Sequence, residues 1–232
     1  MAPAYFLEFK MDSAFQRSES NLTLALLTMS GGLQDAYTYI NRGGVLANAQ
    51  TGNIVRMSLH FLEKDFVGFL AFLFPVLAFA FGVFVSEEVR VRVKNKSKLH
   101  WREYVVILEI IGLFISAFIP HKLDAVANAL VSFVCAMQVQ AFKKVHGYAY
   151  ASTMCIGNIR SGTEAFHEYL VTKDKNFLSK SLEYFGLIFV FALGAGIGVL
   201  TAQHLGCYGI LISCPLLIGA FISMLKSSFV KS

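Results

Sequence analysis

Two stretches of the sequence combine the length of a membrane span with amide, hydroxyl and guanidinium groups that could bind a polar solute. The first is Gly43–Leu62 and the second is Gly147–Leu170. Amide and charged groups are costly in hydrocarbon unless they face protein or a water-filled cavity. We therefore expect apolar helices to shield both stretches and their polar groups to line a solute pathway. The alternative is that they form amphipathic surface helices or plain loops.

The side chains that we expect to line this pathway hydrogen-bond to a polar solute or attract it. They are Asp35, Arg42, Asn48, Gln50, Thr51, Asn53, Arg56, Gln140, Asn158 and Arg160. Helices that begin near Thr51 and Ile156 would direct their positive dipole ends at the centre. Arg56 and Arg160 follow about one helical turn later. This combination favours an anion or a neutral polar solute over a naked cation.

Two acids, Asp35 and Glu109, fall inside apolar segments. An intramembrane acid marks a proton-coupling or ion-coupling site, or else it pairs with a base. For Asp35 the candidate base is Arg42, and both interpretations stay open. Glu109 lies away from both polar stretches, and the same two interpretations apply to it.

The other reactive residues do not form a metal or catalytic motif. Glu164 and His167 match half of a carboxylate-bridged metal motif, but the corresponding positions of the first stretch hold Leu59 and Leu62. The four cysteines form no C-x-x-C pair. We therefore expect no metal, no cofactor and no enzymatic activity.

The composition predicts that lipid surrounds most of the chain. Of the 232 residues, 56% are hydrophobic and 15% are charged, and the mean hydropathy is +0.58. Soluble domains carry about 25% charged residues. The net charge of +5 would suit nucleic acid in a soluble protein, but in an apolar chain basic residues more often set the membrane orientation. The expected partner is the lipid bilayer and not a nucleic acid.

Six segments have the apolar length that a bilayer of about 30 Å requires of a helix. They are Asn21–Ile40, Phe66–Ser86, Tyr104–Pro120, Ala125–Phe142, Leu182–Ala202 and Cys207–Leu225. We expect the first to be a retained span rather than a cleaved signal peptide, because the residues before it form a long stretch of mixed charge.

The distribution of basic residues distinguishes two layouts. If both polar stretches cross the membrane fully, eight spans result and the basic residues divide evenly between the two sides. If each stretch returns to the side that it came from, six spans remain, with fifteen basic residues in the cytoplasm and three outside. The positive-inside rule favours the second layout, with both termini in the cytoplasm.

The two polar stretches also resemble each other. Thr51-Gly52-Asn53-Ile54 precedes Ile156-Gly157-Asn158-Ile159 by 105 positions, and each follows a span and precedes two more. Ser152 and Thr153 match the polar residues at the start of the first stretch. Three spans per half would insert the second half upside down. We predict an all-α polytopic membrane helix bundle, a single membrane domain over residues 1–232. It would comprise six spans, two polar re-entrant helices and two inverted repeats, at residues 21–120 and 125–226.

Glycines have two expected roles. Gly43, Gly44 and Gly147 would permit the sharp turns at the ends of the polar stretches. The small residues at 78–82 and 194–198 would let helices approach closely, with a gate hinge as the alternative.

Several runs carry a resemblance to a known family. They are Gly31-Gly32-Leu33-Gln34-Asp35-Ala36-Tyr37, Arg42-Gly43-Gly44-Val45, Asn48-Ala49-Gln50-Thr51-Gly52-Asn53, Met137-Gln138-Val139-Gln140-Ala141-Phe142 and Gly157-Asn158. Over nearly the whole chain, the sequence resembles the YoaK-like bacterial membrane proteins, a family of uncharacterised function. Val139 departs from the more polar or small residue of many relatives. The resemblance implies a multi-pass protein of the bacterial inner membrane and implies no substrate.

The leading hypothesis is therefore a membrane transporter or channel for a small polar or anionic solute. One alternative is an intramembrane enzyme that acts on a lipid or a quinone, for which Glu164 and His167 are the best acid–base candidates. Another is an accessory or scaffold protein without transport activity. A homodimer is left open, because the sequence shows no interface.

Overall fold

The protein is almost entirely helical. The computed structural model describes residues 20–93, 99–145, 148–149, 153 and 155–225. The α-helices are α1 (Asn21–Asn41), α2 (Gln50–Leu62), α3 (Phe66–Val93), α4 (Trp101–Ala117), α5 (Asp124–Ala141), α6 (Cys155–Thr172), α7 (Lys175–Leu205) and α8 (Ser213–Leu225). Two 3₁₀ helices, η2 (His121–Leu123) and η3 (Gly206–Ile212), and a pair of two-residue antiparallel strands, β1 (Lys144–Val145) and β2 (Tyr148–Ala149), complete the elements. The predicted all-helical class is confirmed, whereas Gly147 and Ser152 lie outside the described residues.

Local sequence explains where several helices begin. The Ser20 hydroxyl accepts a hydrogen bond from the Thr23 backbone N–H, and the Asp174 carboxylate caps α7 in the same way. At α4, the backbone N–H of His100 donates to the Glu103 carboxylate at 2.9 Å. Such side chains satisfy the N–H groups that the first turn of a helix leaves free.

Three helical segments of the described chain are long and apolar enough to cross a membrane. They are Phe66–Val93, His121–Ala141 and Lys175–Leu225, the last of which joins α7, η3 and α8. Only 17% of the residues in the most apolar window of the first segment are buried within the protein. A continuous apolar surface of this kind requires lipid, so the chain is a membrane protein.

Close approaches between helices build the centre of the fold. α1 packs along α7, and α3 packs along α5. A Cβ atom on Gly194 would meet the backbone of Met29, and one on Gly82 would meet the carbonyl group of Phe133. Close packing is thus confirmed at Gly82, Gly194 and Gly198, whereas a Cβ on Gly196 would meet no atom within 4 Å.

α1 and α5 cross in opposite directions. Asn128, near the start of α5, donates to the carbonyl oxygen of Arg42 at the end of α1 (2.7 Å). Gln138, near the end of α5, donates to the carbonyl oxygen of Leu27 near the start of α1 (3.4 Å). The first helix of each predicted half therefore points the opposite way.

α7 runs in the same direction as α1, and α3 in the same direction as α5. Met29 lies beside Gly194, and Asn41 donates to the carbonyl oxygen of Ala202 at 3.2 Å. On the other pair, Ser86 Oγ donates to the carbonyl oxygen of Met137 at 3.1 Å. Each half thus contributes one long helix that packs on the first helix of the other half.

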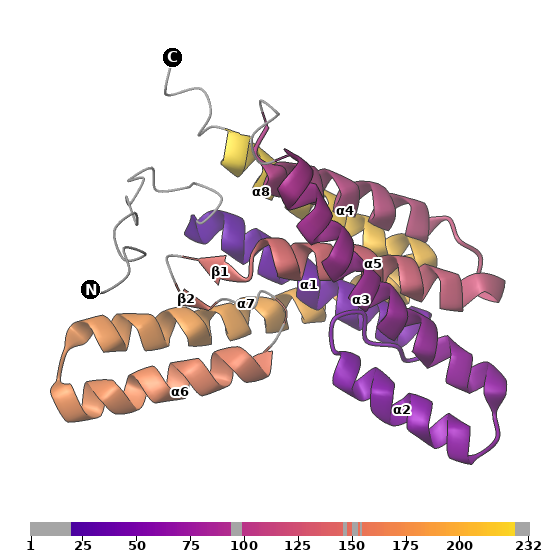
Figure 1. Cartoon of the computed structure of the whole chain (residues 1–232), viewed down its shortest axis with the longest axis horizontal. Coiled ribbons are helices and arrows are strands. Elements are labelled where there is room, and N and C mark those ends of the chain that lie inside the picture. The colour runs from indigo at the N-terminus through magenta and orange to yellow at the C-terminus, as the bar shows by residue number, and fades with distance from the viewer. Residues whose placement is uncertain (1–19, 94–98, 146–147, 150–152, 154, 226–232) are drawn as a thin grey trace, which may run out of the picture.

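The short helices α2 and α6 are the two predicted polar segments. α2 packs on α3 and α6 packs on α7, each joined to its partner by a short turn. In Figure 1 they lie at opposite ends of the longest axis, and each begins near the middle of the molecule and runs outward. In the turn after α2, hydrogen bonds from the Gly68 backbone N–H and from His60 lower the pKa of the Asp65 carboxyl below its usual value.

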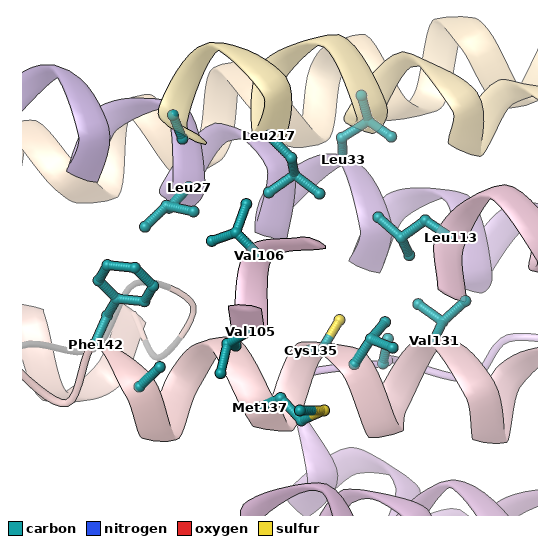
Figure 2. Packing of buried hydrophobic residues seen from close by; sticks show 14 of the residues in the cluster. Leu27, Leu33, Val105, Val106, Leu113, Val131, Cys135, Met137, Phe142 and Leu217 are labelled. Atoms are coloured by element: carbon teal, nitrogen blue, oxygen red, sulfur yellow. The ribbon is translucent and has the colours of Figure 1, made fainter. Parts of the chain in front are cut away.

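The hydrophobic core lies where α1, α4, α5 and α8 meet (Figure 2). Its fully buried side chains include Leu27, Leu33, Leu113, Met137 and Leu217. Close packing of such residues makes the helix positions insensitive to small fluctuations. This core fixes α1, which carries the candidate site.

Candidate functional site

After α1, the chain turns back along this helix before α2 begins. Gly43 and Gly44 have φ angles of +77° and +76°, a conformation that residues with a Cβ rarely adopt. The backbone N–H of Asn48 then donates to Asp35 Oδ1 at 2.7 Å, and its amide group donates to the Gly31 carbonyl oxygen at 3.3 Å. The predicted turn at these two glycines is confirmed, and it returns the chain to the level of the middle of α1.

Asn53 holds the returning loop in place. Its amide group donates to the carbonyl oxygen of Leu46 (2.7 Å), and its Oδ1 accepts from the backbone N–H of the same residue (3.1 Å). Gln50 donates to the Ala47 carbonyl oxygen at 2.7 Å. These bonds satisfy backbone groups of a non-helical segment, which is required at membrane depth.

A cavity of about 880 Å³ opens beside this loop. Its walls come from α1, the loop and start of α2, the middle of α3, the middle of α7, and the residues around the start of α6. The described lining residues are Asp35, Ala36, Tyr39, Ile40, Leu46, Asn48, Ala49, Gln50, Thr51, Val76, Phe79, Ala80, Thr153, Cys155, Ile156, Phe191, Ala195 and Val199. We call it the central cavity. The starts of both polar helices thus face one space.

Few polar groups line the central cavity. Asp35 is the only acid among its described lining residues, and none of these residues is basic. The backbone N–H and the amide group of Asn48 both donate to Asp35 Oδ1, and the backbone N–H of Ala47 also interacts with this carboxylate. Asn48 Oδ1 and Thr153 Oγ1 are buried without a hydrogen-bond partner. Buried polar atoms are normally satisfied, so these two oxygens, which have almost no accessible surface, are an unusual feature of the residues that line the cavity.

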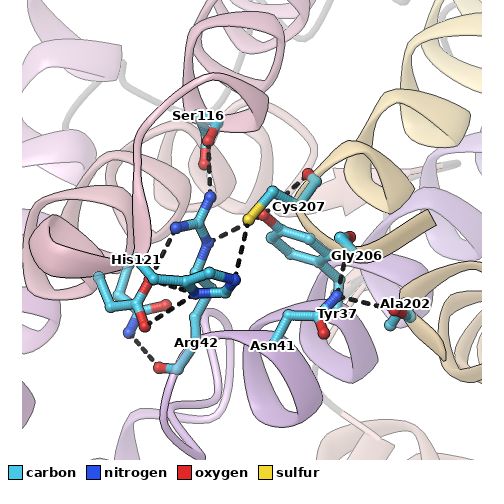
Figure 3. A network of polar contacts seen from close by, with 10 residues as sticks. Tyr37, Asn41, Arg42, Ser116, His121, Ala202, Gly206 and Cys207 are labelled. Carbon is cyan, nitrogen blue, oxygen red and sulfur yellow. Dashed lines mark hydrogen bonds and ion pairs between the residues drawn. The ribbon is translucent and has the colours of Figure 1, made fainter.

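Arg42 forms a closed network at the end of α1 (Figure 3). Its Nη1 lies 2.6 Å from Asp124 Oδ1, and its Nη2 donates to the Ser116 carbonyl oxygen at 3.0 Å. Its Nε donates to the Tyr37 hydroxyl, which donates to the Cys207 carbonyl oxygen. Arg42 is 1% exposed and is not among the described residues that line the central cavity. The alternative that Asp35 pairs with Arg42 is wrong.

A second buried polar chain joins α1, α4 and α5. Gln34 donates to Glu109 Oε1 and to Ser30 Oγ, each at 2.9 Å, and its own Oε1 accepts from the Cys135 thiol. Glu109 and Gln34 are fully buried. Glu109 therefore has an amide partner within the helix bundle, and it does not line the central cavity.

The predicted pathway residues divide into two groups. Four of them, Asp35, Asn48, Gln50 and Thr51, line the central cavity. The described lining does not include Arg42, Asn53, Arg56, Gln140, Asn158 or Arg160.

Each of the remaining polar predictions has its own surroundings. The Arg56 guanidinium lies over the Tyr39 and Phe72 rings, 5.5 and 5.6 Å from their centres. Gln140 donates to the Glu87 carboxylate. Asn158 is buried in the first turn of α6.

Arg160 does not face the centre of the protein. Its side chain is 80% exposed and pairs with Glu164, one turn further along α6, at 2.9 Å. The structure therefore does not bring Arg160 together with the predicted residues that line the central cavity. The Arg160 guanidinium lies on the outer face of α6, away from the central cavity.

Sequence reasoning missed most of the apolar wall. Phe79, Phe191 and Val199 lie within long apolar helices, and nothing in their local pattern distinguishes them from lipid-facing neighbours. For Cys155, the sequence contained only a weak indication that it lines the cavity, namely its position between Thr153 and Asn158 in the second polar stretch. Among the described residues no group of three His, Cys, Asp or Glu side chains could hold a metal ion.

Fold and cavity define a helical membrane protein with a largely apolar central cavity that holds one carboxylate. The chain belongs to the family of proteins of unknown function DUF1275, whose model matches residues 23–223. No curated protein matches the chain, and no solved structure does.

Proposed function

We propose that this protein is a membrane transporter or channel whose solute site is the central cavity. One observation carries the proposal: the starts of α2 and α6, from segments about a hundred positions apart, line the same cavity. Half-helices that begin near the midplane and face a shared space are typical of solute sites in transporters. An accessory or scaffold protein would not need such a cavity.

The proposal includes six spans and two inverted halves. It is supported by the opposite directions of α1 and α5, and by the exchange of α3 and α7 between halves. α2 runs outward from the centre toward one end of the molecule and α6 toward the other (Figure 1). In this arrangement each polar segment re-enters the membrane from its own side. The proposal also puts both termini in the cytoplasm, which the excess of basic residues on that side supports.

The resemblance to YoaK-like proteins supports a location in the bacterial inner membrane. Its motif Asn48–Asn53 forms the end of the loop and the first turn of α2, and four of its residues, Asn48, Ala49, Gln50 and Thr51, line the cavity. This part of the resemblance therefore coincides with the proposed site.

The cavity wall argues for a neutral or cationic solute rather than an anionic one. The expectation of an anion depended on Arg56 and Arg160, and neither lines the cavity. Asp35, which does, would repel an anion. The positive ends of α2 and α6 oppose this effect, each with about half an elementary charge.

An intramembrane enzyme has less support. Glu164 and His167 are exposed on α6, outside the central cavity. Catalysis by this pair would require a substrate that approaches the outer face of α6.

A cavity-filling substitution tests transport. Val76 lines the cavity, whereas its neighbour Leu77 is 56% exposed on the outer surface of α3. Proteoliposomes would be assayed for uptake of glycerol, phenethylamine and benzoate, as neutral, cationic and anionic probes. We expect Val76→Trp to reduce flux of the transported probe about tenfold or more, and Leu77→Trp to leave it unchanged. Absence of flux for all three probes, or equal effects of the two variants, would overturn the proposal.

A further inference from the structure

We propose that the central cavity binds an organic ammonium ion, and that this cation and a proton compete for the carboxylate of Asp35. The inference deepens the transport function proposed above, because it names the class of solute and the coupled ion. It depends on three features of the cavity: its charge, its hydrogen-bond acceptor and its apolar walls.

Asp35 is the only charged residue among the described residues that line the cavity. Its side chain is 6% exposed, and no described basic residue forms an ion pair with it. A buried carboxylate without a cation is unfavourable, and it gains either a proton or a positively charged ligand. The neighbouring charge on α1, Arg42, already pairs with Asp124 and is not available.

The carboxylate of Asp35 offers an acceptor to a donor in the cavity. Asn48 donates to Oδ1 with its backbone N–H and with its amide group, and no described side chain donates to Oδ2. Asn48 Oδ1 and Thr153 Oγ1 belong to lining residues and have no hydrogen-bond partner, but they have almost no accessible surface, so they contribute only partial negative charge from behind the wall. An ammonium group has several N–H donors and a positive charge, and it therefore matches this wall.

The rest of the wall suits an apolar body. Val76, Phe79, Phe191 and Val199 line the cavity from α3 and α7. The volume of about 880 Å³ exceeds that needed by a small inorganic cation, which would also lack enough oxygen ligands here. An amine with an aromatic or aliphatic body uses both parts of the wall.

Competition follows from the single carboxylate. When a proton occupies Asp35, the charge that attracts the ammonium ion is gone, and when the ammonium ion is bound, the proton has left. The titratable groups that face Asp35 are Cys155 at the start of α6, Cys135 on α5 and Tyr39 on α1, and Glu109 lies beyond Cys135. Arg56 lies over the outer side of Tyr39.

The test is equilibrium binding of phenethylamine to the purified full-length protein in detergent, between about pH 5 and pH 8. The probe keeps its charge over this range because the pKa of an alkylammonium group is about 10. We expect affinity to fall as the pH is lowered, by up to about tenfold per pH unit, with release of about one proton per bound amine at low pH. The quaternary analogue trimethyl(phenethyl)ammonium lacks N–H donors, and we expect it to bind more weakly.

The variants Asp35→Asn and Glu109→Gln form the matched pair. Both remove a buried carboxyl group, but only Asp35 lines the cavity. Asp35→Asn should weaken amine binding about tenfold or more and abolish its pH dependence, whereas Glu109→Gln should retain both. Asp65→Asn, in the exposed turn after α2, is a second control in case Glu109→Gln does not fold.

Three results would overturn the inference. The first two are pH-independent amine binding and equal affinity in the protein and in folded Asp35→Asn. The third, flux of glycerol or benzoate without amine binding, would leave the transport function intact. Amine binding without any flux would support this assignment of the site and count against transport.

Discussion

The two halves of the molecule use the same packing but carry different chemistry. α3 of the first half packs on α5, and α7 of the second half packs on α1, in both cases through a glycine against a backbone carbonyl group. The charged residues do not follow this correspondence. The first half supplies Asp35 to the central cavity, whereas the second half supplies no charged residue among the described lining, only Thr153, Cys155, Ile156, Phe191, Ala195 and Val199.

This difference indicates that packing and binding place separate demands on the two halves. Close helix packing requires only that the residue at the contact has a small side chain, and both halves have a glycine there. A single carboxylate in a shared cavity is sufficient to bind one cation, and a second would add repulsion between like charges. Four sets of substitutions sharpen or break this comparison, in order of expected effect.

The largest effect is expected at Arg42, whose network connects the two halves. Arg42→Ala should lower the free energy of unfolding by about 3 kcal/mol, because Asp124 and the Ser116 carbonyl oxygen lose their charged donor. Thermal unfolding in detergent, followed by the fluorescence of Trp101, measures it. Asp124→Asn, which keeps an acceptor, should cost less. If Arg42→Ala melts like the wild type, the network does not hold the halves together.

The glycine contacts should be equivalent in the two halves. Gly82→Ala and Gly194→Ala should each cost about 2 kcal/mol, since the new Cβ atom would overlap the backbone of a neighbouring helix. Gly196→Ala is the matched control, because its Cβ would meet nothing within 4 Å. The same unfolding assay applies, and a large difference between the first two variants would contradict equivalent packing.

Asn53 and Asn158 occupy matching positions in the two polar segments. Asn53→Ala should cost about 1 kcal/mol for each of the two lost hydrogen bonds to Leu46. It should also weaken ligand binding, since Leu46 lines the cavity. A similar loss in Asn158→Ala would show that both segments are held alike. Normal stability of Asn53→Ala would exclude the role assigned to its amide group.

The smallest effects are expected at the arginines of the polar segments. Arg56→Ala should lose about 0.5–1 kcal/mol, because its guanidinium lies over two aromatic rings. Arg160→Ala should have no measurable effect on stability or flux, since this side chain is exposed and pairs only with Glu164 among the described residues. A loss of flux in Arg160→Ala would return this residue to the pathway.

Much of the fold could be predicted because the signals were local. The apolar segments around residues 66–86, 125–142 and 182–225 correspond to the long helices, and the polar segments to α2 and α6. Gly43 and Gly44 predicted the turn that the structure contains. The site was harder to predict, because a polar residue on a helix gives no sign of which neighbour it faces. Because Asp35 and Arg42 are seven positions apart, an ion pair between them was one interpretation of the sequence. In the structure Arg42 instead forms an ion pair with Asp124, which is 82 positions away.

The sequence alone determined that this chain is helical, requires lipid and carries two polar segments that lipid cannot solvate. These properties follow from composition and from periodicity along the chain, both of which are local. Only the tertiary structure decided which polar groups meet. Burial and hydrogen bonding depend on helices that cross far apart in the sequence, and these crossings enclosed Arg42 in a network while they left Asp35 at the wall of a cavity.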